Sequence, residues 1–292
     1  MFATCRRVNA RKTDLDYCAE LVKSADPDRY LASLFAPRPT RQHLLALYAF
    51  NVEVARIRDV VSEPTLGEIR LAWWRETVAA IYDGEIRHHP VVEGLAAAID
   101  AAHLPAESFL ALIAARRADF EFTPFASEDD LDAYIEATSS MLMAMAAMIE
   151  MPDADRQPLG EASRPAGRAW ALTGLLRALP FHARRGQIFL PQTRLHRHRL
   201  APDDILAGRH TGSLADAMNE WVQEARDQLA EMHRQLKALQ KIPVAAFLPT
   251  ALCRFYLRIV ERPGFDPFTE STDIALVKRQ FVLLGRGLIG RL

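Results

Sequence analysis

Residues 175–191, which read LLRALPFHARRGQIFLP, hold the densest group of side chains that could do chemistry. Arg177, Arg184 and Arg185 could bind a diphosphate or an anionic headgroup, because the planar guanidinium matches the geometry of phosphate oxygens. The same arginines could equally form structural salt bridges. His182 lies among them, and we expect it to be a hydrogen-bonded interior residue rather than a catalytic base.

Two other groups of residues favour structural roles. His196 and His198 lie in the sequence HRHR, which is typical of a solvated loop rather than of a metal site. The methionine-rich run at residues 141–148 predicts core packing, with a soft partner-binding surface as the alternative.

The composition is that of a globular protein with little charge bias. Of the 292 residues, 50% are hydrophobic and 25% are charged, and the formal net charge is −1. This balance gives no global field that would attract nucleic acid, so we predict no nucleic-acid partner. Cys5, Cys18 and Cys253 form no CxxC pair, which indicates a reduced intracellular compartment. No apolar run is long enough to predict a membrane-spanning helix.

The first residues, MFATCRRVNARK, are basic and free of acids, which superficially suits an organellar presequence. They are short and lack an apolar core, so they do not form a secretory signal. We expect residues 1–12 to be frayed or locally helical rather than to act as a targeting segment.

The hydrophobic pattern predicts helices almost throughout, without the alternation and hairpin turns of a sheet. The expected helices cover residues 40–61 with Thr40 as the cap, 68–82, 90–103, 107–120, 128–149, 158–179, 213–240, 243–260 and 272–292, with short helical pieces near 202–206 and a basic loop at 194–199. The connections are short, so we predict a single all-α domain over residues 1–292 rather than two domains.

The last predicted helix, at residues 272–292, is basic and amphipathic. It mixes Lys278, Arg279, Arg286 and Arg291 with a dense apolar set. Such a helix can lie on an anionic membrane surface. The alternative is a closing helix of the bundle, weakened near its end by glycines.

The chain resembles squalene and phytoene synthases from about residue 29 to residue 259. The matching pieces, in order, are DRYLASLFAPRPTRQHLLALYAF at residues 28–50, Trp74-Arg75, Asp119, the Tyr134 helix and residues 167–191. The resemblance implies a helical bundle of the isoprenoid-synthase type. It also adds Arg41 and Tyr48, in the first piece, to the candidate ligand- or phosphate-binding residues.

This family condenses two prenyl diphosphates head to head, using Mg²⁺ held by two DxxxD motifs on facing helices. Acids at i and i+4 lie on one helix face, and carboxylates are the ligands that Mg²⁺ prefers. In this chain the first motif aligns on Ala55 and Asp59, and the second on Ala178 and His182. One carboxylate remains where four are expected, and imidazole is a poor replacement. We therefore predict no metal, no catalytic residues and no cofactor; Mg²⁺ would be needed only by an active synthase.

Other positions that the family uses for catalysis are also altered. The family's polar residues upstream of the second motif align on Ala171 and Gly174, so a polar face becomes a small apolar one. The family's small channel-lining residues align near Ser139, Ser140 and Met143. A methionine at the last position would narrow a channel that the family keeps open.

Two segments are most similar to one branch of the family, which contains complex I (NADH:ubiquinone oxidoreductase) assembly factor 6. They read AFNVEVARIRDVVSEPTLGEIRLAWWRETVAAIYDG and RALPFHARRGQIFLP. This resemblance implies a non-catalytic role in complex I biogenesis. The partners would be complex I subunits or assembly intermediates, with a prenyl lipid or phospholipid in the degenerate cavity.

Two alternatives stay open at this point. The chain could be an active head-to-head prenyl-diphosphate transferase, or a lipid binder unrelated to respiration. For location, the sequence favours the cytoplasm of a bacterium, with peripheral contact at the inner face of the membrane; the mitochondrial matrix is the alternative.

Overall fold

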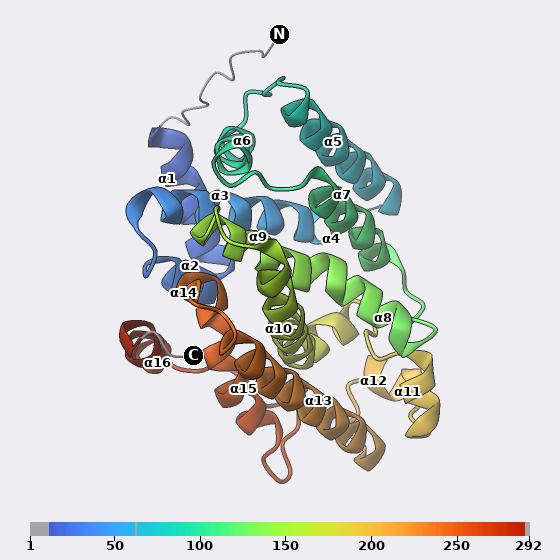
Figure 1. The fold of residues 1–292 in the computed structure, drawn as a ribbon. Helices are drawn as coiled ribbons and strands as arrows, with labels where there is room; N and C mark the ends of the chain where they lie inside the picture. The colour runs from blue at the N-terminus through green and yellow to red at the C-terminus, as the bar shows by residue number, and fades with distance from the viewer. Residues whose placement is uncertain (1–11, 62, 290–292) are drawn as a thin grey trace.

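The computed structural model describes residues 12–61 and 63–289. Within these ranges the regular structure is entirely helical, and the helices pack into one bundle (Figure 1). The expectation for residues 1–11 and the predicted membrane contact of Arg291 lie outside the described residues.

The first half of the chain builds one side of the bundle. Its elements are α1 (Lys12–Ala25), α2 (Pro27–Ser33), α3 (Arg38–Ala55), α4 (Ile57–Val60), α5 (Pro64–Tyr82), α6 (Pro90–Ala102), α7 (Ala106–Ala115), the 3₁₀ segment η1 (Arg116–Phe120) and α8 (Glu128–Ile135). Here α3 packs against α1 and α6, and α5 packs against α7. The start of α8 is a capping box between Ser127 and Asp130, which satisfies backbone N–H groups of its first turn.

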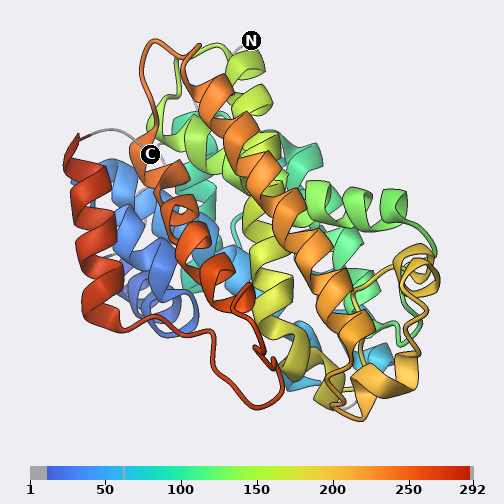
Figure 2. The ribbon, with the colours of Figure 1, turned by 90° about the horizontal axis from the view of Figure 1, so that it is seen from below.

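The second half centres on one long helix. Its elements are the π-helical turn η2 (Glu136–Ser140), α9 (Met141–Glu150), α10 (Arg156–Arg184), α11 (Gln192–Arg197), α12 (Pro202–Leu206), α13 (Gly212–Leu236), α14 (Val244–Phe247), the 3₁₀ segment η3 (Leu248–Leu252), α15 (Cys253–Val260) and α16 (Leu276–Ile289). Helix α10 runs through the middle and packs along α13, with α9, η2 and α15 also against it (Figure 2).

Helix α10 extends beyond the predicted 158–179 and carries the segment of interest to its end. It contains Pro165 and Pro180 inside the helix and ends after Arg184. Gly186 adopts a φ of +74°, and the N–H of Gln187 donates to the carbonyl of His182 at 2.9 Å. This left-handed ending is a Schellman-type cap that only glycine adopts without strain.

Some predicted boundaries are wrong. Residues 40–61 do not form one helix: α3 begins at Arg38 and ends at Ala55, and Arg56 starts a tighter turn in which the N–H of Asp59 donates to its carbonyl. Pro37, not Thr40, is the cap residue. Residues 243–260 are divided into α14, η3 and α15.

The predicted basic loop at residues 194–199 is also wrong, because most of it belongs to α11. Arg194 is only 4% exposed and donates to Glu128 of α8 and to Glu224 of α13, each at 3.0 Å. The two acids that form ion pairs with this arginine are distant in sequence, so the local composition could not indicate that it is buried.

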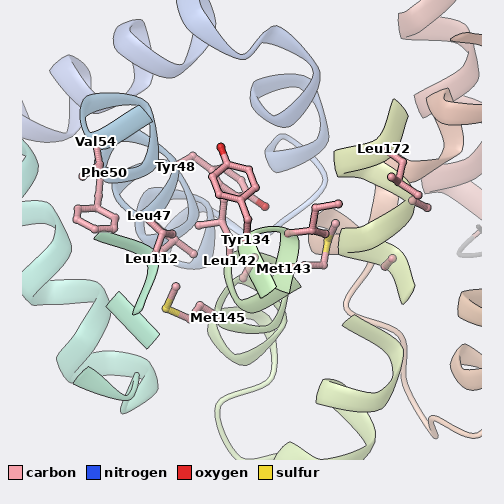
Figure 3. Close-up of a cluster of buried hydrophobic side chains, with 14 of the residues drawn as sticks. Leu47, Tyr48, Phe50, Val54, Leu112, Tyr134, Leu142, Met143, Met145 and Leu172 are labelled. Carbon is pink, nitrogen blue, oxygen red and sulfur yellow. The ribbon is translucent and has the colours of Figure 1, made fainter. Parts of the chain in front are cut away.

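Large hydrophobic side chains fill the centre of the bundle. Figure 3 shows Leu47, Tyr48, Leu142, Met143 and Leu172 in one cluster, and all five are buried. The prediction that the methionine run packs in the core is confirmed for Met143 and Met145, which are both buried. Among the described residues, no helix combines the length and apolar character needed to cross a bilayer.

Candidate functional site

A pocket of about 370 Å³ lies beside the second half of α10, where the connection from α15 to α16 crosses it. We call this connection, residues 261–275, the strap. Gly174, Arg177 and Ala178 line the pocket from α10, and residues 270–273 line it from the strap. The volume is at the lower end of the range for small-molecule sites. Gly174 and Ala178, which the resemblance aligns with polar or acidic residues of the family, thus open onto a pocket.

Arg177 is the pocket's cation, and it is held on both sides. Its guanidinium carbon lies 3.7 Å from the ring centroid of Tyr256, which is a cation–π contact with α15. Its Nη2 lies 3.4 Å from Oδ1 of Asp273 in the strap. The orientation of Arg177 is therefore set by the protein itself.

These contacts belong to a ring that ties five elements together. Arg279 of α16 lies 3.9 Å from Asp273 and 3.2 Å from the buried Asp28 of α2. The hydroxyl of Tyr256 donates to the same Asp28 carboxylate at 2.7 Å, and its ring stacks on Arg177. Burial and the Asp28 charge raise the pKa of Tyr256, so the phenol stays protonated. Arg279 therefore faces inward, and the prediction that it contributes to a membrane-facing basic surface is wrong.

The charge around the pocket does not suit a diphosphate. Glu270, which accepts from Arg262 at 2.7 Å, and Asp273 both line the pocket, against the single guanidinium of Arg177. A diphosphate entering this pocket would meet two carboxylates and displace one of them from Arg177. Like charges at such distances oppose binding.

Asp59, which the resemblance aligns with a motif acid, is paired with a guanidinium. It forms an ion pair with Arg185, whose own guanidinium carbon lies 4.8 Å from the ring centroid of Phe181. The RRG segment that follows α10 thus reaches back to the α4 helix. At this position the structure favours the salt-bridge interpretation of the arginine over free phosphate binding.

His182 is a half-buried, neutral side chain. Burial lowers its pKa to about 4, with Asp59 acting in the opposite direction and Arg185 in the same one. Its ring centroid lies 4.5 Å from that of Phe189, and its Nδ1 is buried without a hydrogen-bond partner. The adjoining cavity, about 10 Å³, is the size of one water molecule. The ring is thus partly interior, as expected, and among the described residues no protein group bonds its Nδ1.

The donor set does not fit the magnesium ions that the resemblance implies. Within the described part of the chain, no three His, Cys, Asp or Glu side chains lie close enough to hold a metal ion. Of the positions on which the resemblance aligns the motifs, Asp59 alone is a carboxylate and it is neutralised by Arg185, while Ala55 and Ala178 offer no donor. Mg²⁺ requires oxygen ligands in near-octahedral order, so we assign it no role here.

A cluster of polar side chains joins Asp119, Tyr134 and Arg116. The hydroxyl of Tyr134 donates to Asp119 at 2.7 Å, and Arg116 approaches Asp119 at 3.3 Å and Tyr134 at 3.0 Å. Gln187, two residues beyond Arg185, donates to the Asp119 carbonyl. Burial raises the pKa of Asp119, and Arg116 opposes that shift. The cluster links η1, α8 and the segment after α10.

The other candidate ligand residues, Arg41, Tyr48 and Arg184, do not line the pocket. Arg41 donates to the carbonyls of Leu34 and Ala36 at 3.0 and 3.1 Å, which caps the chain after α2. Tyr48 is buried in the core, with the guanidinium carbon of Arg29 5.5 Å from its ring centroid. Arg184 is exposed at the end of α10.

The residues predicted near the family's channel pack helices together instead. The hydroxyl of Ser139 donates to the carbonyl of Gly167 at 2.7 Å, and that of Ser140 to Arg164 at 3.1 Å. Met143 is buried, as expected for a residue that narrows the channel. Ala171 is half-buried on α10.

The HRHR histidines lie in a helix and its cap rather than in a loop. His196 is exposed, while Nε2 of His198 lies 2.6 Å from Glu220 of α13. His198 therefore belongs to the ionic network around Arg194.

Sequence reasoning missed three residues of the ring around Arg177, namely Asp28, Tyr256 and Asp273. Each is a common residue type in an ordinary helix or loop, and their separations in the chain exceed any helical period. Only Asp28 stood in a segment that the resemblance had marked.

Comparison with known proteins gives a family and several relatives. The squalene/phytoene synthase family model matches residues 22–281. "NADH dehydrogenase (ubiquinone) complex I, assembly factor 6" from Bos taurus is 29% identical over 255 residues, covering 87% of this chain and 76% of the relative, and the Homo sapiens protein matches to the same extent. "Phytoene synthase 1, chloroplastic" from Arabidopsis thaliana is 24% identical over 272 residues, covering 90% of this chain and 64% of that protein.

Solved structures share the fold. A dehydrosqualene synthase in complex with a ligand has a TM-score of 0.81 at 18% identity, covering 95% of this chain and 96% of that chain. A squalene synthase from Alicyclobacillus acidocaldarius has a TM-score of 0.71 at 22% identity, covering 95% and 94%. At these identities the likeness shows the fold alone, and it confirms the predicted all-α bundle of the isoprenoid-synthase type.

Proposed function

Because this chain belongs to the squalene/phytoene synthase family, we propose that it is a non-catalytic member that acts in the biogenesis of respiratory complex I. The observation that carries the non-catalytic part of the proposal is the pairing of Asp59, the only acid that the resemblance leaves in either motif, with Arg185. We take residues 1–292 as one domain of this family.

The argument against catalysis is electrostatic. Ionising an allylic diphosphate requires its negative charge to be neutralised, which metal ions or a cluster of cations can do. The pocket beside α10 offers Arg177 together with Glu270 and Asp273, and Arg185 is already neutralised by Asp59. Neither arrangement gathers the positive charge that the reaction needs.

The argument for complex I rests on the relatives. The proteins named complex I assembly factor 6 match this chain more strongly, at 29% identity, than the phytoene synthase does at 24%. On this basis we propose complex I subunits or assembly intermediates as the partners. The corresponding place of action is the bacterial inner membrane face or the mitochondrial matrix, depending on the host.

A gene deletion in the native host tests the role directly. We expect NADH:ubiquinone activity in membranes, and assembled complex I on native gels, to fall strongly in the deletion strain. Wild type and Asp59→Asn should restore both equally, because an exposed ion pair contributes about 1 kcal/mol or less to stability. Asp129→Asn, at an exposed position of α8, is the matched control.

Two results would contradict this proposal. Normal complex I in the deletion strain would remove the assembly role. Magnesium-dependent release of pyrophosphate from farnesyl or geranylgeranyl diphosphate, abolished by Asp59→Asn, would instead support the prenyl-transferase alternative.

The pocket gives a separate test of how the protein acts. We propose that it holds a lipid or prenyl group, or a side chain of an assembly partner. A Cβ at Gly174, which lines the pocket, would meet no atom within 4 Å, so we choose Gly174→Leu to reduce the pocket volume. We expect this variant to fold, to lose any lipid adduct seen by native mass spectrometry, and to reduce complementation at least about tenfold, as removal of a well-filled apolar contact would.

Gly160→Leu is the matched control, since Gly160 lies on the same helix, outside the pocket lining, and also has open space at its Cβ. Both changes replace glycine by a better helix former, so neither should lower stability. Full complementation by Gly174→Leu would show that the pocket is dispensable and would leave docking through the surface as the mode of action.

A further inference from the structure

The outward side of α16 is an apolar ridge with no partner within the described chain. Val277, Phe281, Leu284 and Leu288 are 60%, 70%, 46% and 79% exposed. Their spacings of four, three and four residues place them on one face of the helix. Figure 2 places α16 at the edge of the bundle. Single exposed apolar residues are ordinary, but a ridge of four on one helix indicates an interaction surface.

The opposite side of the same helix packs against the rest of the bundle. Leu283 is buried, and Arg279 faces Asp28. A Cβ at Gly287 would lie 2.4 Å from the ring of Phe35, so the helix backbone comes very close to the chain after α2 there. The ridge therefore remains outside when the hydrophobic core is complete, and folding does not need it.

Cations border the ridge on the side of α15. Arg254 and Arg258 of α15 and Lys278 of α16 surround the ring of Phe255, at 4.6, 5.9 and 5.1 Å from its centroid. Arg286 of α16 adds a charge close to Arg254, but it lies seven residues after Arg279 and therefore on the inner side of the helix, away from the ridge.

These four cations form no ion pair with a carboxylate anywhere in the described chain. Burial, together with repulsion from Arg286 and Arg258, lowers the pKa of Arg254, and no acid offsets this effect. Most other arginines near the site have acids, as Arg177, Arg185 and Arg194 do. Cations that repel one another without a nearby acid lower the stability of the fold. A negatively charged partner beside the apolar ridge would relieve this repulsion.

We propose that the exposed sides of α15 and α16 form a docking face for an anionic lipid bilayer. The apolar ridge would enter the boundary between headgroups and acyl chains, and Arg254, Arg258 and Lys278 would meet the headgroup phosphates. This face goes beyond the proposed role in complex I biogenesis and does not depend on it.

Helix α5 offers an internal comparison. It also carries an exposed apolar row, Leu66, Ile69 and Trp73, but acids accompany the neighbouring cations. Glu68 pairs with an arginine of η1 at 2.9 Å, and Glu76 lies 3.7 Å from another arginine. A bilayer that selects for positive charge should therefore bind the α16 face and not the α5 row.

Vesicle flotation of the full chain tests the proposal. The probes are phosphatidylcholine vesicles and phosphatidylcholine vesicles enriched in phosphatidylglycerol. We expect the wild type to float only with the anionic vesicles and to be released by high salt. Each cation contributes about a fivefold gain in partitioning, so Arg254→Gln/Arg258→Gln/Lys278→Gln should weaken binding about a hundredfold. Phe281→Ser/Leu288→Ser should weaken it at least about tenfold.

The matched control is Ile69→Ser/Arg75→Gln on α5, which should float like the wild type. Circular dichroism should show all variants folded, since every substituted side chain is outside the core. The proposal is overturned if the wild type fails to float with anionic vesicles, or binds neutral vesicles equally well. It is also overturned if the α5 variant loses binding as strongly as the α16 variants. A wild-type dimer that does not bind lipid and that Phe281→Ser converts into a monomer would show instead that the ridge joins two copies of the chain.

Discussion

Asp119→Asn is expected to lower the free energy of unfolding by about 3 kcal/mol. The side chain is buried, accepts from Tyr134 at 2.7 Å and faces Arg116 at 3.3 Å. Asparagine has the same shape and keeps the bond from Tyr134, but it leaves the Arg116 guanidinium buried without its counter-charge. Removing one partner of a buried ion pair costs roughly 3–5 kcal/mol, and the retained hydrogen bond places the estimate at the lower end.

Urea unfolding followed by circular dichroism measures this loss. Asp129→Asn, an exposed acid near the start of α8, should change stability by no more than about 0.5 kcal/mol. The double variant Arg116→Gln/Asp119→Asn should be less destabilised than the sum of the single variants, because the two charges depend on each other. Strict additivity would show that the charge pair is not the source of the effect.

Gly167→Ala is expected to destabilise the protein by about 3 kcal/mol through a steric clash. An alanine Cβ would lie 2.4 Å from the Cα of Ser140 and 2.6 Å from its backbone nitrogen. Because these are backbone atoms of the π-helical turn η2, no rotamer change can relieve the overlap. Helix α10 would have to move away, which would also lengthen the 2.7 Å hydrogen bond from Ser139 to the Gly167 carbonyl.

Gly160→Ala provides the contrast on the same helix. Its Cβ meets nothing within 4 Å, so it should gain about 1 kcal/mol from the higher helix propensity of alanine. The same unfolding experiment compares the two. Equal stability of Gly160→Ala and Gly167→Ala would mean that α10 and η2 do not approach closely in solution.

The family fold was accessible from the sequence because its signals are local. Apolar spacing marked the helices, and the sequence pieces around residues 28–50 and 167–191 pointed to the family that the comparisons then confirmed. The predicted helix and loop boundaries were wrong where contacts between distant parts of the chain determine the local structure. Arg194 was expected in a loop, yet acids from two other helices bring it into the interior.

For the candidate site, the sequence predicted which groups are missing but not how the remaining ones are used. The residue types at Ala55 and Ala178 are read directly from the sequence, and that they stand at motif positions stays a prediction of the resemblance. That Asp59 pairs with Arg185, 126 positions away, follows only from the folded chain. Arg177 was a candidate phosphate ligand, and the structure adds its partners Asp273 and Tyr256.

By itself, then, the sequence determined the helical bundle and the family, because helix periodicity and residue type are properties of short segments. The tertiary structure alone decided which charges neutralise one another. It paired Arg279 with Asp28 while leaving Lys278 without a carboxylate partner in the described chain, although the two are adjacent in α16. A helix turns by about 100° per residue, so neighbours in sequence face different surroundings, and those surroundings come from distant parts of the chain.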